Sequence, residues 1–182
     1  NGSLQQQQLA NSLLSLNLKS NKLEFVKEHH FAGLVALQYL SLRNNMLSSI
    51  HADSFRDLAS LVELDLSDNC LFWLEKGLFS RLQRLKTLYL NRNVLNRLDL
   101  GVVFHAQAYL TFLDLSSNRV EEFILADEEE PDWLLGNLTG VDLSSNRLLR
   151  QFQLSSRLVS VSQDNSPKLK RIRYGKQRQR LD

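Results

Sequence analysis

The stretch Leu61-Val-Glu-Leu64-Asp-Leu66-Ser-Asp-Asn69 contains the pattern that decides the fold of this chain. The same pattern, L-x-x-L-x-L-x-x-N, ends at Asn45 and again at Asn93, 24 residues to either side. Self-similarity at a fixed period of about 20 to 29 residues is typical of chains that form a solenoid of stacked turns. Three copies in register are hard to obtain by chance, so the sequence predicts such a solenoid.

The residue types in the pattern fit the physical needs of one turn. In L-x-L, alternate side chains point to opposite faces of a short strand, so the leucines face inward and the x residues outward. The asparagine follows the strand, where its amide can bond buried backbone groups that would otherwise lack partners. A phenylalanine ten or eleven residues after each asparagine is predicted to close the outer side of the turn: Phe55, Phe79 and Phe104.

Looser copies extend the pattern in both directions and end at Asn21, Asn118 and Asn146. The turn before Asn146 carries an insertion that includes residues 126–133. In the last turn we expect Val159 and Val161 to face inward, which places Ser160 beside Asp142 in the sheet.

These copies define the domain organisation. The predicted solenoid spans residues 13–165 in about seven turns. Residues 1–12 are predicted to form a frayed or partial first turn. Residues 166–182 are read as a basic C-terminal tail that acts as a cap or a linker.

Composition excludes several classes of protein. The chain has 182 residues and a net charge of +2, and no apolar run approaches the 18 or so residues of a membrane span. Seven acidic residues within 121–132 are offset by seven basic residues within 168–180, and no nucleic-acid partner is predicted. The lone cysteine, Cys70, rules out a disulfide framework within the chain and leaves open a free thiol or an intermolecular disulfide.

The outer segments of the turns carry a resemblance to a known family. Phe31-Ala-Gly-Leu34, Phe55-Arg-Asp-Leu58 and Phe79-Ser-Arg-Leu82 match the F-x-x-L segment of the extracellular, "typical" leucine-rich repeat proteins. The chain resembles Toll-like receptor ectodomains, Slit-type guidance proteins and the mosquito leucine-rich immune proteins over about residues 10–165. The predicted fold is thus an α/β-type leucine-rich repeat solenoid, with a parallel β-sheet on its concave face and loops and short 3-10 or helical turns on its convex face.

The resemblance also implies a function and a location. It implies a non-catalytic module that recognises a protein partner outside the cell, secreted or as a receptor ectodomain, in innate immunity or receptor signalling. In the mosquito group helical segments that follow the solenoid pair with a partner chain, so the resemblance implies a dimer or a larger complex. Two sequons, at Asn1 and Asn137, are candidates for glycosylation in a secreted chain.

The outward positions of the strands are where a solenoid of this kind carries its variable, partner-binding residues. Aromatic residues and arginine, the types enriched at interface hot spots, occur there among acidic residues. The predicted partner-binding set is Tyr39, Arg43, Glu63, Asp65, Tyr89, Arg92, Phe112 and Asp114. The alternative is a polar sheet face with scattered aromatics, which needs no ligand.

Other functions rest on weaker signals. A polyanion such as a glycosaminoglycan or an anionic lipid is the alternative partner, through the basic tail and the region of Arg81, Arg84 and Lys86. A cytosolic scaffold is a third reading, compatible with the single cysteine. No catalytic motif is present, and the histidines lack metal-ligand spacing, His51 and His105 being isolated in sequence. The sequence therefore predicts no enzyme, cofactor or metal.

Overall fold

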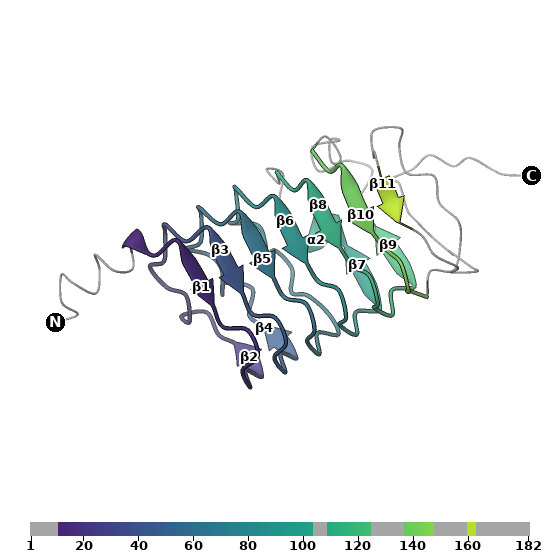
Figure 1. Cartoon of the computed structure of the whole chain (residues 1–182), viewed down its shortest axis with the longest axis horizontal. Coiled ribbons are helices and arrows are strands. Elements are labelled where there is room, and N and C mark those ends of the chain that lie inside the picture. The colour runs from purple at the N-terminus through teal and green to yellow at the C-terminus, as the bar shows by residue number, and fades with distance from the viewer. Residues whose placement is uncertain (1–10, 104–108, 125–136, 148–159, 163–182) are drawn as a thin grey trace, which may run out of the picture.

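The computed structural model describes residues 11–103, 109–124, 137–147 and 160–162. Its main element is one seven-stranded parallel sheet, with the strands side by side in chain order (Figure 1). The strands are β1 (Ser15–Asn17), β3 (Tyr39–Ser41), β5 (Glu63–Asp65), β6 (Thr87–Tyr89), β8 (Phe112–Asp114), β10 (Gly140–Asp142) and β11 (Ser160–Ser162). The predicted solenoid with a parallel sheet along one side is confirmed.

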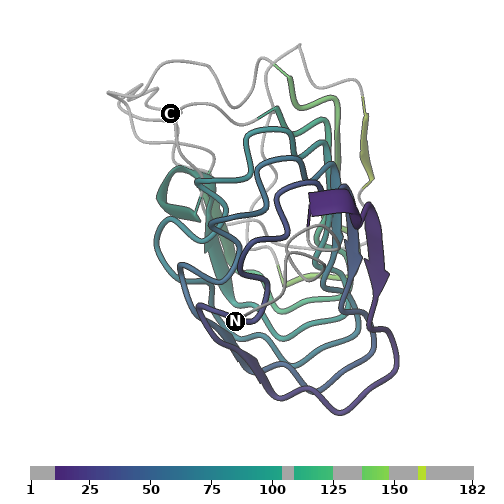
Figure 2. The ribbon, with the colours of Figure 1, turned by 90° about the vertical axis from the view of Figure 1, so that its left-hand side faces the viewer.

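Shorter elements lie on the other side of the coil, away from the main sheet (Figure 2). Strand β2 (Phe25–Val26) pairs with β4 (Ser49–Ile50), and β7 (Arg97–Asp99) pairs with β9 (Glu122–Ile124), both in parallel. A four-residue helix, α2 (Leu100–Val103), follows β7. The predicted loops and short helical turns of this side are therefore accompanied by two small sheets.

The core lies between the two sides and consists of the inward leucines and a row of phenylalanines. The leucines of the three regular copies are at most 2 % exposed: Leu40, Leu42, Leu64, Leu66, Leu88 and Leu90. Phe55 stacks between Phe31 and Phe79, with ring centroids 6.0 and 6.4 Å apart. Full burial of each such side chain contributes roughly 1.5–3 kcal/mol, so the stack of turns is the source of stability.

The strands keep their register although the spacing between copies changes. Leu88 pairs with Leu113 after 25 residues, and Leu113 pairs with Val141 after 28. The extra residues therefore lie in the connections, and most of the predicted insertion lies outside the described residues, as do Phe104, residues 1–10 and the basic tail.

The register predicted for the last strand is wrong by two residues. Ser162, rather than Ser160, pairs with Asp142, and Val161 pairs with Val141. A shift of two residues keeps the same side chains facing inward, because side chains alternate with a period of two. The apolar alternation therefore could not distinguish the two placements.

Buried asparagines join the turns where the strands end. The side chain of Asn69 accepts the Leu47 N–H of the preceding turn at 3.0 Å. Its Nδ2 donates to the carbonyls of Leu42 (3.0 Å), Leu66 (3.1 Å) and Ser67 (3.1 Å). Asn45, Asn93, Asn118 and Asn146 repeat this arrangement, which confirms the predicted role of the asparagine.

Successive asparagines share carbonyl acceptors. The Leu42 carbonyl accepts from both Asn45 (2.9 Å) and Asn69 (3.0 Å), and the Leu66 carbonyl accepts from both Asn69 and Asn93. Each of these carbonyls has two lone pairs, so both ladder bonds can form at once. The result is a continuous asparagine ladder along the coil.

The residue before the asparagine of each copy has a left-handed backbone. Ser20, Asn44, Asp68, Arg92, Ser117 and Ser145 have φ values between 52° and 59°. Such a conformation is uncommon for residues other than glycine and persists only where the surroundings fix it. Here the N–H of Asp68 donates to the Asn91 carbonyl of the next turn at 3.0 Å, so the turn is part of the ladder.

We expect Asn69→Leu to destabilise the protein by about 1–3 kcal/mol or more. It leaves the buried Leu47 N–H without an acceptor, whereas Leu42 and Leu66 keep one ladder donor each. The matched control is Asn91→Leu, since Asn91 is half-buried on the outward side. Thermal unfolding of the two variants checks this, and equal midpoints would contradict the ladder.

Candidate functional site

The outward side of the main sheet, here called the sheet face, presents the first and third residues of each strand. Over strands β1 to β10 these residues are Ser15, Asn17, Tyr39, Ser41, Glu63, Asp65, Thr87, Tyr89, Phe112, Asp114, Gly140 and Asp142. All but Gly140 are exposed or half-buried, whereas from β3 to β10 the middle residue of each strand is buried. The sheet face is therefore a continuous surface on a rigid base.

The structure brings two of the three predicted aromatic residues together. The rings of Tyr89 and Phe112 meet edge to face, with centroids 6.1 Å apart and an interplanar angle of 62°. Such pairs contribute about 0.5–1.5 kcal/mol beyond their burial. Tyr39 is 47 % exposed and lies on β3, which β5 separates from β6, so it pairs in register with Glu63. The same gap is present in the sequence, where the copy that ends at Asn69 lies between those of Tyr39 and Tyr89.

Carboxylates surround Tyr89. In the register of the sheet it lies between Asp65 on β5 and Asp114 on β8. Burial first, and then the charges of Glu63, Asp65 and Asp114, raise the pKa of Tyr89 above its ordinary value of 10.0. The phenol therefore keeps its proton at neutral pH and can donate a hydrogen bond.

The aspartates of the sheet face also shape the ends of their strands. Oδ1 of Asp65 accepts the N–H of Ser67 at 3.0 Å and also its hydroxyl. Oδ1 of Asp114 accepts the N–H of Ser116 at 2.9 Å, and Asp142 repeats the bond one strand further on. These contacts are Asx-turns, which hold the carboxylates in fixed positions through one oxygen each. The sequence analysis missed this structural role.

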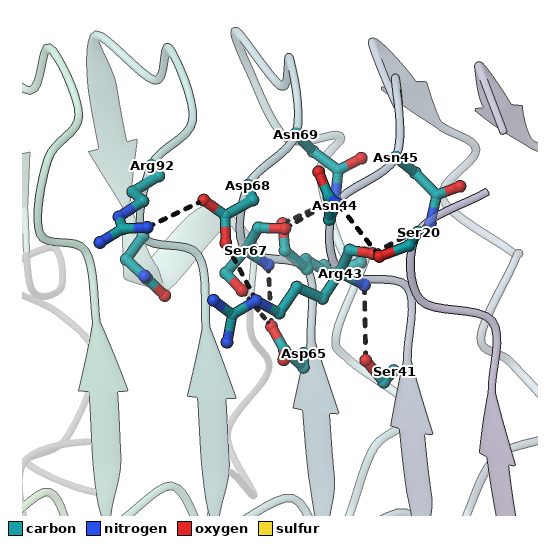
Figure 3. A network of polar contacts seen from close by, with 12 residues as sticks. Ser20, Ser41, Arg43, Asn44, Asn45, Asp65, Ser67, Asp68, Asn69 and Arg92 are labelled. Atoms are coloured by element: carbon teal, nitrogen blue, oxygen red, sulfur yellow. Dashed lines mark hydrogen bonds and ion pairs between the residues drawn. The ribbon is translucent and has the colours of Figure 1, made fainter. Parts of the chain in front are cut away.

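Arg43 and Arg92, both predicted to contact a partner, are bound to Asp68 (Figure 3). Nε of Arg43 lies 3.0 Å from Oδ2 of Asp68, and Nη1 of Arg92 lies 3.4 Å from Oδ1. The acid thus links three successive turns. Both arginine side chains stay partly exposed, at 41 % and 64 %, and pairs of this kind contribute only about 0.2–1 kcal/mol.

Sequence reasoning missed Asp68, although Arg92 occupies the same position of the next copy. Asp68 lies 25 residues after Arg43 and 24 before Arg92, and only the left-handed turn before Asn69 directs it toward both. The signal in the sequence was its place immediately before the ladder asparagine.

His51 is not isolated, contrary to the sequence reading. Stacking of the turns places Glu28, His51 and Asp53 with their ligand atoms within 4.8 Å of one another. The Nδ1 atom of His51 already accepts the N–H of Asp53 at 3.2 Å, and both residues are exposed. Exposed groups of these types are common without an ion, so we assign no metal to them.

The remaining candidates lie on the surface. Cys70 is exposed and has no disulfide partner in the described part of the chain. Asn137 is exposed just before β10, while the other sequon, at Asn1, lies outside the described residues. The basic residues Arg81, Arg84 and Lys86 are exposed.

Comparison with known families identifies the class of protein. The leucine rich repeat family matches residues 11–71 and 63–120, which together are more than half of the chain. The chain belongs to this family. None of the helices that the structure describes is long and apolar enough to cross a membrane.

Solved structures of the family share the fold. The leucine-rich repeat domain of APL1B is 22 % identical, with a TM-score of 0.65 over 81 % of this chain and 39 % of that chain. A leucine-rich repeat protein of Leptospira interrogans is 31 % identical, with a TM-score of 0.61 over 77 % and 33 %. TLR13, solved in complex with the RNA ssRNA13, is 25 % identical, with a TM-score of 0.60 over 81 % and 20 %.

These structures confirm the resemblance to Toll-like receptors and to the mosquito leucine-rich immune proteins at the level of the fold. The chain spans less than half the length of each. A search of curated protein sequences finds no match. The family match defines a leucine-rich repeat domain, which is a protein-interaction module.

The raised pKa of Tyr89 predicts how the tyrosine titrates. Glu63→Gln should lower this pKa but leave it above 10.0, because burial is the larger cause. Asp142→Asn should not change it, since Asp142 is not among the causes. Tyrosine-ring NMR during a pH titration, assigned with Tyr89→Phe, gives the values; a wild-type value at or below 10.0 would contradict the site.

The raised pKa of Tyr89 also determines how its contribution to stability changes with pH. The folded-state pKa lies above the unfolded value, so the contribution of Tyr89 to stability is complete below pH 10 and is lost as the pH rises through the folded-state pKa.

Proposed function

We propose that this chain is a non-catalytic recognition module that binds a protein partner through its sheet face, in an extracellular immune or receptor protein. The observation that supports it best is the edge-to-face pair of Tyr89 and Phe112 at the centre of that face. Phe112 is 36 % exposed, so the pair presents apolar surface to solvent. A partner that covers these rings would gain the free energy of burying them.

The rigidity of the site supports the proposal. The strands beneath the rings are held by the asparagine ladder, and the flanking aspartates are held by their Asx-turns. A surface that is ordered before binding loses less conformational entropy when a partner docks. The proposed contact set also includes the residues around the two rings: Tyr39, Arg43, Glu63, Asp65, Arg92 and Asp114.

Similarity to other proteins supports the extracellular part of the proposal. The F-x-x-L segments resemble the extracellular class, and APL1B and TLR13 have the same fold. The proposal includes glycosylation at the exposed Asn137, which a loss of mass on glycosidase treatment of the secreted protein would detect. An intermolecular disulfide at Cys70 stays a prediction.

The experiment compares two double variants as bait in the extracellular fluid of the source organism. Tyr89→Ala/Phe112→Ala removes the aromatic pair of the sheet face. Phe72→Ala/Trp73→Ala removes two aromatic residues, each 52 % exposed, outside the main sheet. Trp73 corresponds to the first residue of β4, one period later in the sequence.

We expect the wild type and the Phe72/Trp73 variant to capture the same protein partner, and the Tyr89/Phe112 variant to lose it by about tenfold or more, because hot-spot aromatics commonly contribute 2 kcal/mol or more. Quantitative mass spectrometry of the bound fraction measures this. Equal capture by both variants, each shown to be folded by circular dichroism, would reject the sheet face as the binding surface.

A further inference from the structure

We propose that the sheet face between β5 and β8 binds an arginine side chain on a basic segment of the partner polypeptide. This inference rests on the proposed function and specifies the chemistry of the partner.

The charge of the sheet face is one-sided. Among the first and third residues of the main-sheet strands β1, β3, β5, β6, β8 and β10 there are four carboxylates and no basic side chain. The acidic residues are Glu63, Asp65, Asp114 and Asp142. A surface with charges of one sign attracts groups of opposite charge and repels groups of the same charge, so a polyanion does not fit the sheet face.

The acids around Tyr89 lack the compensation that the chain provides elsewhere. Asp68, just past the end of β5, is held by Arg43 and Arg92. Within the described residues no ion pair involves Glu63, Asp65 or Asp114. The contrast matters because these acids lie within one or two turns of the same arginines. Their negative potential is therefore left for a cation from outside the chain.

The geometry suits a planar cation in particular. Asp65 and Asp114 are the register partners of Tyr89 on the two neighbouring strands, whose backbones lie about 4.8 Å from that of β6. Each uses Oδ1 in its Asx-turn, and no hydrogen bond within the described residues reaches Oδ2. A guanidinium can stack on a tyrosine ring and donate in its plane to carboxylates on both sides, which an ammonium group cannot do.

The test uses a fluorescent octa-arginine peptide as the probe, with octa-lysine and octa-glutamate peptides for comparison. Asp65→Asn/Asp114→Asn removes both charges and keeps the turns, because Asn17 forms the same turn in the first repeat by accepting the Lys19 N–H. Asp53→Asn/Asp99→Asn is the matched control. It removes the same net charge, but Asp53 follows β4 and Asp99 ends β7, both outside the main sheet.

We expect the Asp65/Asp114 variant to bind octa-arginine about tenfold more weakly than the wild type, and the control to differ by less than about twofold, as measured by fluorescence anisotropy. Octa-lysine should bind the wild type several-fold more weakly than octa-arginine, and octa-glutamate should not compete. Equal weakening in the two variants would show that net charge alone attracts the peptide, and would overturn the inference. Equal affinity of the wild type for the arginine and lysine peptides would overturn the assignment of arginine.

The same peptides separate this inference from the proposed function. Octa-arginine should displace a partner that the wild type has captured and that Tyr89→Ala/Phe112→Ala fails to capture. If the capture of the partner depends on the two rings but octa-arginine does not displace it, the inference of a basic segment is wrong and the recognition function is still supported. A partner captured equally by the wild type and the ring variant would overturn the recognition function itself.

Discussion

The bond from a buried asparagine amide to the backbone of the neighbouring turn is the interaction on which the structure depends. A short strand ends at each turn with backbone groups still inside the coil, where an unpaired group costs about 1–3 kcal/mol. Asn69 removes this penalty in its own turn and in the preceding one, since it accepts from Leu47 and donates to Leu42 and Leu66. The leucines alone would give an apolar stack without a fixed spacing; the amides hold each turn in register with the next.

The sheet face follows from this constraint. Because each strand ends at a fixed point, the next residues can form the Asx-turns that orient Asp65 and Asp114, and the left-handed residue Asp68 can reach arginines on both neighbouring turns. Charged and aromatic side chains that are far apart in the sequence are thereby placed on one rigid surface. Tyr89 is the residue at which these effects meet, and burial together with three acids raises its pKa.

The fold could be predicted from the sequence because its determinants recur. Leu66 and Asn69 have counterparts one period away in each direction, so several copies support the same interpretation. The site could be predicted only in part, because its residues occur once. The outward positions of the copies correctly placed Tyr89 and Phe112 on one face, but they did not show that the two rings touch.

The contacts that the sequence missed join residues at unequal offsets in different turns, such as Arg43 with Asp68 and Glu28 with His51. No local pattern marks them, since they depend on the stacking of the turns. The two-residue error at β11 has another cause, because the alternation of inward and outward residues fits both registers.

Hydrogen exchange of the ladder amides tests the central role of the asparagines most directly. The N–H groups of Leu47, Leu71 and Leu95 each donate to the side-chain oxygen of an asparagine in the next turn, at 3.0 to 3.1 Å. If the ladder holds the turns together, these amides exchange only by opening of the stack and are protected as strongly as the amides of β5 and β6. Exchange as fast as that of exposed loop amides, in a protein whose sheet amides stay protected, would contradict this account.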